Sequence, residues 1–155
     1  METLSNSIQA AMRTSSIPPA IKMPKARDIM VTAGLITFRP KQRLAAVIRS
    51  MLRHQISGAP VVDGEMRLVG MISEYDCMRV IAAGAYEGDP VDGERTVAEL
   101  MSTDVTTIDP DLNLYGIAHV FMTRGRRRLP VVADGNVVGQ LSRRDVLRAI
   151  DKLLS

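Results

Sequence analysis

The chain has 155 residues, of which 46% are hydrophobic and 24% charged, and its formal net charge is +3. This composition is typical of one compact globular domain or of two small halves that share a core. The single cysteine, Cys77, excludes an intrachain disulfide, and no run approaches the roughly 20 apolar residues that a membrane-spanning helix needs.

Residues 1–25 contain Pro18, Pro19 and Pro24 and are expected to form an N-terminal extension. This stretch lacks a basic start followed by a long apolar run, so no secretory signal is predicted. With one cysteine and no membrane segment, we expect a cytoplasmic protein in a reducing compartment.

Residues 26–82 form a first motif of alternating helical and extended patterns. A short helical piece, "ARDIM", precedes a brief strand that ends in "TFRP", and two further strands in "APVVDGEMRLVGMI" are joined near Asp63-Gly64. The last helix of the motif carries Cys77, Met78 and Ile81, with Cys77 expected to be a buried small hydrophobe. Another helix is expected between the "TFRP" strand and the two later strands. Its apolar residues recur at helical spacing and should form one buried stripe: Leu44, Val47, Ile48, Met51 and Leu52.

A connector with glycine and proline, residues 83–96, leads to a second motif, residues 97–155, that repeats the first. "VAELM", "TIDP", "LPVVADGNVVGQL" and a final helix with Val146, Leu147 and Ile150 follow in the same order, with Asp134-Gly135 as a strong hairpin signal. The sequence therefore predicts an α/β (α+β) fold of two pseudo-symmetric β-α-β-β-α motifs packed sheet to sheet. The corresponding buried stripe is expected at Leu114, Ile117, Ala118, Phe121 and Met122.

The two motifs share a Ser-x-x-Asp corner where the last strand meets the last helix, in "GMISEYD" and "GQLSRRD". Taken singly, Ser142 and Asp145 form an ordinary helix N-terminus, with serine as the cap and an acid in the first turn. Capping and ligand binding are compatible, because a helix start offers N–H groups to a phosphate and a carboxylate accepts both hydroxyls of a ribose. The duplication of Ser73 and Asp76 by Ser142 and Asp145 favours a binding role.

In these repeated motifs the chain resembles tandem cystathionine-β-synthase (CBS) domains, the Bateman module, over about residues 26–150. The family fold implies clefts between the two motifs that take adenine nucleotides (AMP, ADP or ATP) as regulatory ligands, with no cofactor required. The resemblance further implies a crossed arrangement, in which one motif holds the base and the other holds the ribose. One site would combine Thr37, Ile56, Ser57 and Ala59 with Ser142, Arg144 and Asp145, and the other would combine Thr107, Arg126, Arg127, Arg128 and Leu129 with Ser73 and Asp76.

The same resemblance predicts that the two clefts differ. Arg127 and Arg128 occupy positions where related modules place phosphate-binding basic residues, whereas the first motif has Ser57 and Gly58 there. Its site would depend on Arg143 and Arg144 for phosphate charge. Glu74, beside the other ribose corner, would partly offset the arginines.

Other interpretations of the same residues remain open at this stage. The arginine run also suits a solvated helix end, since cations favour a helix C-terminus. We do not expect nucleic acid as a partner, because a broad basic face and stacking aromatics are lacking. His54 and His119 have no accompanying ligand cluster, so no metal site is predicted.

The sequence contains no nucleophile–base pair and no Walker-type glycine loop, so we do not expect an enzyme. We expect a nucleotide-sensing regulatory module that acts through a homodimer or a regulated partner protein, away from membranes. The alternatives are a constitutive dimerisation or assembly scaffold with empty clefts, or a binder of NADH, S-adenosylmethionine or nucleic acid.

Overall fold

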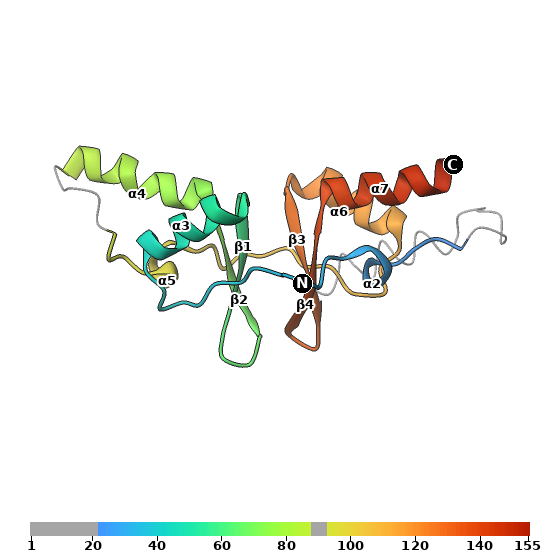
Figure 1. Cartoon of the computed structure of the whole chain (residues 1–155), viewed down its shortest axis with the longest axis horizontal. Helices are drawn as coiled ribbons and strands as arrows, with labels where there is room; N and C mark the ends of the chain where they lie inside the picture. Colours follow the sequence, from blue (N-terminus) through green and yellow to red (C-terminus); the bar gives the residue numbers. More distant parts are fainter. Residues whose placement is uncertain (1–21, 88–92) are drawn as a thin grey trace. The chain divides into compact units, whose positions relative to one another are not determined.

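The computed structural model describes residues 22–87 and 93–155 (Figure 1). Most of the predicted extension, 1–25, and part of the predicted connector, 83–96, therefore lie outside the described residues. The chain divides into two compact units, which are described separately here: one is Ile36–Val105, and the other combines the chain up to Leu35 with Thr106–Ser155.

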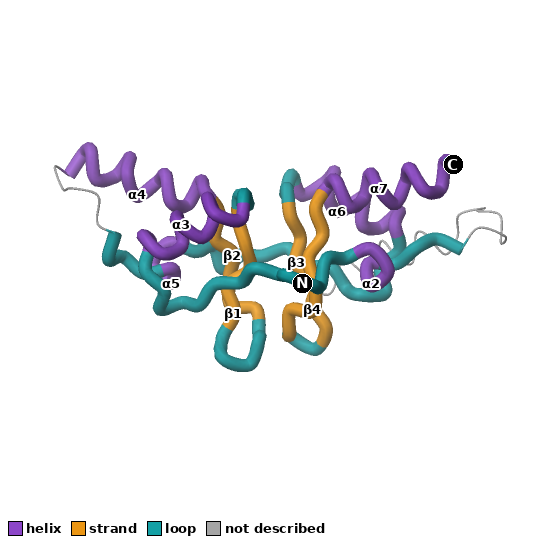
Figure 2. Tube along the Cα trace, in the orientation of Figure 1, coloured by secondary structure: helices purple, strands orange, loops and turns teal. Residues whose placement is uncertain are grey.

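The unit Ile36–Val105 is built around an antiparallel hairpin (Figure 2). Its elements are α3 (Leu44–His54), β1 (Gly58–Val62), β2 (Leu68–Ser73), α4 (Glu74–Glu87) and α5 (Val97–Leu100). The hairpin loop is organised by the Asp63 carboxylate, which accepts the backbone N–H groups of Glu65 and Arg67 at 2.8 and 3.0 Å. Helix α4 runs to Glu87, so the first residues of the predicted connector are helical.

The second unit contains a hairpin of the same kind. Its elements are α2 (Ala26–Ile29), α6 (Leu114–Arg124), β3 (Arg128–Ala133), β4 (Asn136–Ser142) and α7 (Arg143–Leu154). Asp134 and Gly135, with φ of 52° and 83°, form the tight turn between β3 and β4, as predicted.

The first predicted strand of each motif is reduced to a single residue. Phe38 pairs in parallel with Val61 of β1, and Ile108 pairs in the same way with Val131 of β3. Pro40 and Pro110 follow two residues later and have no N–H with which to extend a ladder. Apart from this reduction, the predicted order of elements is confirmed.

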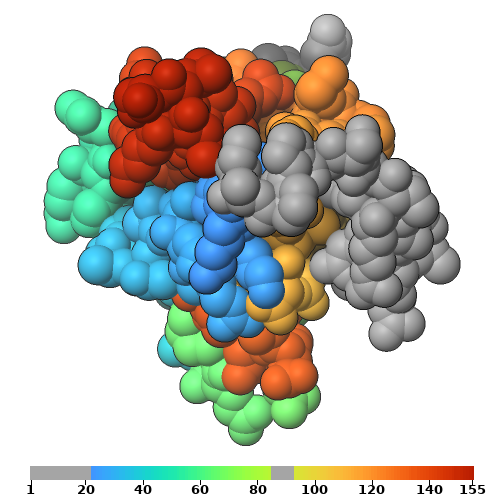
Figure 3. All heavy atoms as spheres, turned by 90° about the vertical axis from the view of Figure 1, so that its right-hand side faces the viewer, coloured from blue at the N-terminus to red at the C-terminus, as the bar shows by residue number. Residues whose placement is uncertain are grey.

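The short helices α2 and α5 pack away from the sequence motifs that they begin. In the unit of the second motif, the backbone N–H of Ala26 in α2 donates to Leu112 at 2.8 Å, and α2 lies against α7 (Figure 3). In the unit of the first motif, the N–H of Val97 at the start of α5 donates to Gln42 at 2.9 Å. The repeats seen in the sequence and the compact units of the fold therefore have different boundaries.

A polar contact also attaches α2 to its unit. The Arg27 guanidinium donates to the Asp111 carboxylate at 2.7 and 2.9 Å. This hydrogen bond, followed by the positive charges of Arg27 and Lys25, lowers the pKa of Asp111 below its usual value.

The chain that follows each short helix contacts a glycine of the adjacent hairpin. A Cβ on Gly139 would lie 2.5 Å from Met30 Sδ, and one on Gly70 would lie 2.7 Å from Met101 Sδ and 2.9 Å from the Ser102 carbonyl oxygen. Only a residue without a side chain allows this approach.

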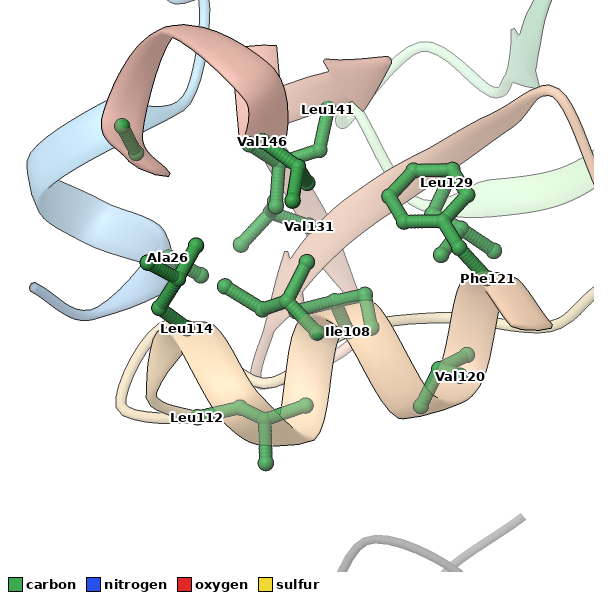
Figure 4. Close-up of a cluster of buried hydrophobic side chains, with 12 residues drawn as sticks. Ala26, Ile108, Leu112, Leu114, Val120, Phe121, Leu129, Val131, Leu141 and Val146 are labelled. Carbon is green, nitrogen blue, oxygen red and sulfur yellow. The ribbon is translucent and has the colours of Figure 1, made fainter. Parts of the chain in front are cut away.

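Each unit has its own aliphatic core. In the second unit, Leu129 and Leu141 of the hairpin and Ala26 of α2 are completely buried (Figure 4). Ile117 of α6 is buried in the same core. The corresponding core of the first unit includes Val47.

The predicted buried stripes are correct in their first turns and wrong at their ends. Leu52 is 74% exposed and Met122 is 84% exposed. Successive residues of an α-helix are about 100° apart, so the residue eight positions after the first points about 80° away from it. The last residue of each stripe is therefore turned away from the core. Val120, which the stripe omitted, is buried instead. In the part of the chain that is described, no helix is long and apolar enough to cross a membrane.

Candidate functional site

The Ser-x-x-Asp corner of the second motif forms the N-terminus of α7. The Asp145 Oδ2 oxygen accepts from the backbone N–H of Ser142 at 2.7 Å and from its hydroxyl at 2.9 Å. The Ser142 hydroxyl oxygen in turn accepts from the Asp145 N–H at 3.3 Å. These bonds form a capping box, so the helix-capping interpretation is confirmed.

The corner of the first motif has the same bonds at the start of α4. Asp76 Oδ2 accepts from the N–H and the hydroxyl of Ser73 at 2.8 and 3.0 Å, and the Ser73 hydroxyl accepts from the Asp76 N–H at 3.3 Å. The sequence repeat is therefore reproduced atom by atom at the two corners.

Each aspartate has a second partner that the sequence analysis did not identify. Arg148 donates to Asp145 Oδ1 at 3.1 Å, and Arg79 donates to Asp76 Oδ1 at 3.3 Å. The signal was present in the sequence as an extended repeat, Ser-x-x-Asp-x-x-Arg, in both motifs.

The two carboxylates are largely shielded from solvent, whereas the arginines that pair with them are exposed. The side chains of Asp76 and Asp145 are 11% and 10% exposed, against 57% for Arg79 and 69% for Arg148. Each corner therefore combines a carboxylate oxygen in the capping bonds, Oδ2, with one whose partner is an exposed cation, Oδ1.

Within each unit, the loop before the first hairpin strand lies beside the Ser-x-x-Asp corner of the same motif. In the second unit, Arg128 pairs directly with Ser142, and Arg143 Nε donates to the Arg126 carbonyl oxygen at 3.2 Å. In the first unit, Gly58 pairs with Ser73. The structure thus brings the arginine run and the corner of the second motif onto one surface.

The residues predicted to hold the base fall into two groups. Four of them are half-buried and lie next to the hairpins: Thr37, Thr107, Ile56 and Ser57. In contrast, the side chains of Ala59 and Leu129 belong to the two cores, so a ligand can meet only their backbone.

The two corners differ in charge. Among the described residues, none of the arginines around the second corner has an ion-pair partner: Arg126, Arg127, Arg128, Arg143 and Arg144. Arg126 and Arg127 lie beyond the end of α6, and Arg128 is the first residue of β3. The first corner has Ser57 and Gly58 in the corresponding loop and Glu74 at its helix start, so it lacks this positive charge.

Cys77 follows the first corner and is buried, as expected. Burial raises the pKa of its thiol, and the nearby carboxylates of Asp76 and Glu74 raise it further. Over residues 22–87 and 93–155, no group of three or more histidine, cysteine or acidic side chains could hold a metal ion.

A sequence model of the CBS domain matches residues 26–83 and 97–152. The chain belongs to the CBS domain family. The two matches are in tandem, so the chain carries a pair of CBS domains, and its mixed helix and strand content fits the α+β fold of that pair.

Two relatives and one solved structure illustrate this membership. The CBS domain-containing protein YhcV of Bacillus subtilis is 30% identical over 118 residues, covering 76% of this chain and 79% of its own. MJ1225 of Methanocaldococcus jannaschii is 29% identical over 131 residues, which cover 84% of this chain but 44% of that protein. This chain therefore spans less than half the length of that relative. The crystal structure of CBSX2 in complex with AMP is 26% identical with a TM-score of 0.75, over 85% of this chain and 99% of that one.

Proposed function

We propose that this CBS-domain pair is a regulatory module that binds adenine nucleotides, with AMP, ADP and ATP as the candidate ligands. The observation that carries the proposal is the second corner. There the largely shielded Asp145 carboxylate and a cluster of arginines that have no ion-pair partner among the described residues lie on one surface. The similarity to CBSX2, which was crystallised with AMP, supports the same ligand class.

The geometry of Asp145 supports a ribose-binding role. Its Oδ2 oxygen is committed to the capping box, which fixes the carboxylate in place. Among the described residues, only the exposed Arg148 donates to its Oδ1 oxygen. Because the Arg148 guanidinium is exposed and has water as an alternative partner, a ribose hydroxyl that donates to Oδ1 can take its place. In the first motif Arg79 pairs with Asp76 in the same way, but it also donates to the Leu100 carbonyl oxygen and lies over the Tyr75 ring, so it is held more firmly.

The arginines of the second corner support a phosphate-binding role. A guanidinium donates two parallel hydrogen bonds to phosphate oxygens, and its charge persists at every physiological pH. Because the first corner has Glu74 and no arginine in its loop, we expect highly charged nucleotides to bind more tightly where Arg126–Arg128 contribute.

One form of this proposal uses the second motif alone, with Ser142, Asp145 and Arg126–Arg128 on the surface that the structure brings together. The other form keeps the crossed residue sets named in the sequence analysis. Asp145 and Asp76 would then each belong to a different ligand site, with Thr37 or Thr107 contributing near the base. Regulation would follow if the ligand binds one conformation of the pair more tightly than another, because only differential affinity shifts an equilibrium. A homodimer or a partner protein would respond to that shift.

Isothermal titration calorimetry with AMP, ADP and ATP tests the proposal. We expect Asp145→Ala and Asp76→Ala each to remove one binding event, and the double variant to remove both. Asp151→Ala is the matched control, because Asp151 is an exposed acid on the same helix as Asp145. Free ligand at 100 times its Kd should also raise the free energy of unfolding of the wild type by about 2.7 kcal/mol.

Two results would contradict the proposal. Absence of binding by every nucleotide would favour a constitutive scaffold, and unchanged stoichiometry in both aspartate variants would exclude the ribose assignment. Tighter binding of NADH or S-adenosylmethionine than of AMP, ADP or ATP would show that the site is selective for another class of ligand.

A scaffold role is the second candidate, and the exposed apolar side chains of the long helices favour it. Tyr75, Met78 and Ile81 are exposed on α4, as are Leu147 and Leu154 on α7. Such residues suit an interface with another copy of the chain or with a partner. Light scattering would show a dimer in the absence of nucleotide, and Met78→Lys or Leu147→Lys would reduce its mass to that of a monomer.

A further inference from the structure

The strand β4 presents a polar face that the sequence analysis did not identify. From Gly139 onward its residues alternate, and Leu141 faces the hydrophobic core together with Gly139, which contacts Met30. Gln140 and Ser142 therefore point to the opposite face. Their direct partners on β3, Pro130 and Arg128, share that face.

Gln140 has an unsatisfied side chain at a fixed position. Its Oε1 oxygen is buried and has no hydrogen-bond partner, and no other buried side-chain nitrogen or oxygen in the described part of the chain is in this state. The backbone of Gln140 is held by Val31, with hydrogen bonds of 2.9 and 3.0 Å in both directions. Buried polar atoms almost always have a partner, so an orphaned acceptor on a fixed strand requires an explanation.

We infer that Gln140 determines base specificity at the second corner, by accepting an N–H group of the nucleotide base through its Oε1 oxygen. The inference rests on the proposed nucleotide-binding function, in the form in which the second motif holds both ribose and base, and it adds the chemical group that is recognised. An amide oxygen accepts hydrogen bonds and cannot donate them. With Oε1 towards the base, as in the structure, it accepts from the exocyclic amino group at C6 of adenine, whereas the oxo group at C6 of hypoxanthine has no hydrogen to donate.

The position of Gln140 suits this role. Gln140 is two residues from Ser142, a separation of about 7 Å along an antiparallel strand, which is comparable to the length of a nucleoside. A ribose held at the Ser142 corner can thus bring its base to Gln140, while Arg128 on the neighbouring strand lies towards the phosphate end.

The first motif has no polar side chain at the position of Gln140. Met71 occupies the position that corresponds to Gln140, opposite Pro60, and Gly58 corresponds to Arg128. A Cβ on Gly58 would lie 2.9 Å from the Ile72 carbonyl oxygen, so the backbone excludes a side chain there. Base discrimination through a hydrogen bond is therefore expected only at the second motif.

The test compares AMP with IMP, in which an oxo group replaces the amino group at C6 of the base and N1 carries a proton, by calorimetry on the full chain. For the wild type we expect AMP to bind about tenfold more tightly than IMP, the effect of one hydrogen bond between neutral groups. In Gln140→Met, which installs the residue of the first motif, AMP binding should weaken about tenfold and IMP binding should not change. Gln140→Glu retains the acceptor oxygen and should retain the preference.

Two controls separate this role from a structural one. Met71→Leu should leave the ratio of AMP to IMP affinity at the second site unchanged. Without ligand, Gln140→Met should melt at the same temperature as the wild type or higher, because replacing an unpaired buried polar group by an apolar one is neutral or stabilising.

Each contrary result has a distinct meaning. Equal loss of AMP and IMP affinity in Gln140→Met, a wild-type preference for IMP, or a lower melting temperature of ligand-free Gln140→Met would overturn the inference. If the wild type binds AMP and IMP equally, this inference fails and the proposed function stands. If the wild type binds no nucleotide, the proposed function itself fails.

Discussion

The contact between Gly139 and Met30 makes Gly139→Ala a sensitive test of how the short helix α2 is attached. The added Cβ would lie 2.5 Å from Met30 Sδ and 2.8 Å from its Cγ, well inside van der Waals contact. Overpacking of this kind destabilises by about 1–3 kcal/mol, so we expect a loss of about 2 kcal/mol. For a chain of 155 residues, that corresponds to a decrease in Tm of about 4–8 °C.

A second substitution shows whether the loss comes from this contact. Met30→Ala removes the atoms that the new Cβ meets, so the double variant should be more stable than the sum of the single changes predicts, by about 1 kcal/mol. Urea denaturation followed by circular dichroism gives the free energies of all four proteins.

The first motif provides the matched comparison. A Cβ on Gly70 would meet the Ser102 carbonyl oxygen at 2.9 Å as well as the Met101 side chain. Because the carbonyl belongs to the backbone, Met101→Ala should not rescue Gly70→Ala. Strict additivity for the Gly139 pair, or equal rescue of both pairs, would refute the reasoning.

Three further predictions concern the remainder of the fold. The Cys77 thiol, whose pKa is raised, should react with a disulfide reagent at pH 8 at least about tenfold more slowly in the folded protein than in guanidinium, and equal rates would contradict its burial. The Asp111 carboxyl should titrate below its ordinary pKa in NMR spectra, and Arg27→Ala should raise that pKa. Because the pKa of Asp111 is lower in the folded state, its interaction with Arg27 stabilises the fold at neutral pH, and this stabilisation is lost as the pH falls below about 4. Met122→Gln should change the free energy of unfolding by less than about 0.5 kcal/mol, whereas Ile117→Ala should lower it by about 2–5 kcal/mol, and a reversed order in chemical denaturation would contradict the burial of the stripe.

The sequence predicted the features that depend on local pattern. The turn at Asp134-Gly135 requires positive φ angles that few residues adopt, so the hairpin was recognisable. A capping box needs only two residues three positions apart, so both corners were recognisable as well. The family resemblance rested on the duplication of these same local motifs.

The features that depend on distant neighbours were not recognisable. Nothing in "ARDIM" indicates that Ala26 packs in the unit of the second motif, because an apolar side chain does not encode its partner. Likewise, Gln140 stands out only once the alternation of β4 shows which face it shares with Ser142. The helix stripes failed at Leu52 and Met122 because these residues lie at the edge of the stripe, about 80° from its first residue, where burial depends on what packs beside the helix.

The exchange of α2 and α5 has a consequence for fragments of this chain. A fragment cut at the repeat boundary, in residues 83–96, separates Ala26 from the core it fills and Val97 from the core of the first motif. A fragment cut before Ile36 and after Val105 retains one complete core on a continuous stretch of chain. The smallest transferable piece of this protein is therefore offset from the unit that was duplicated in its sequence.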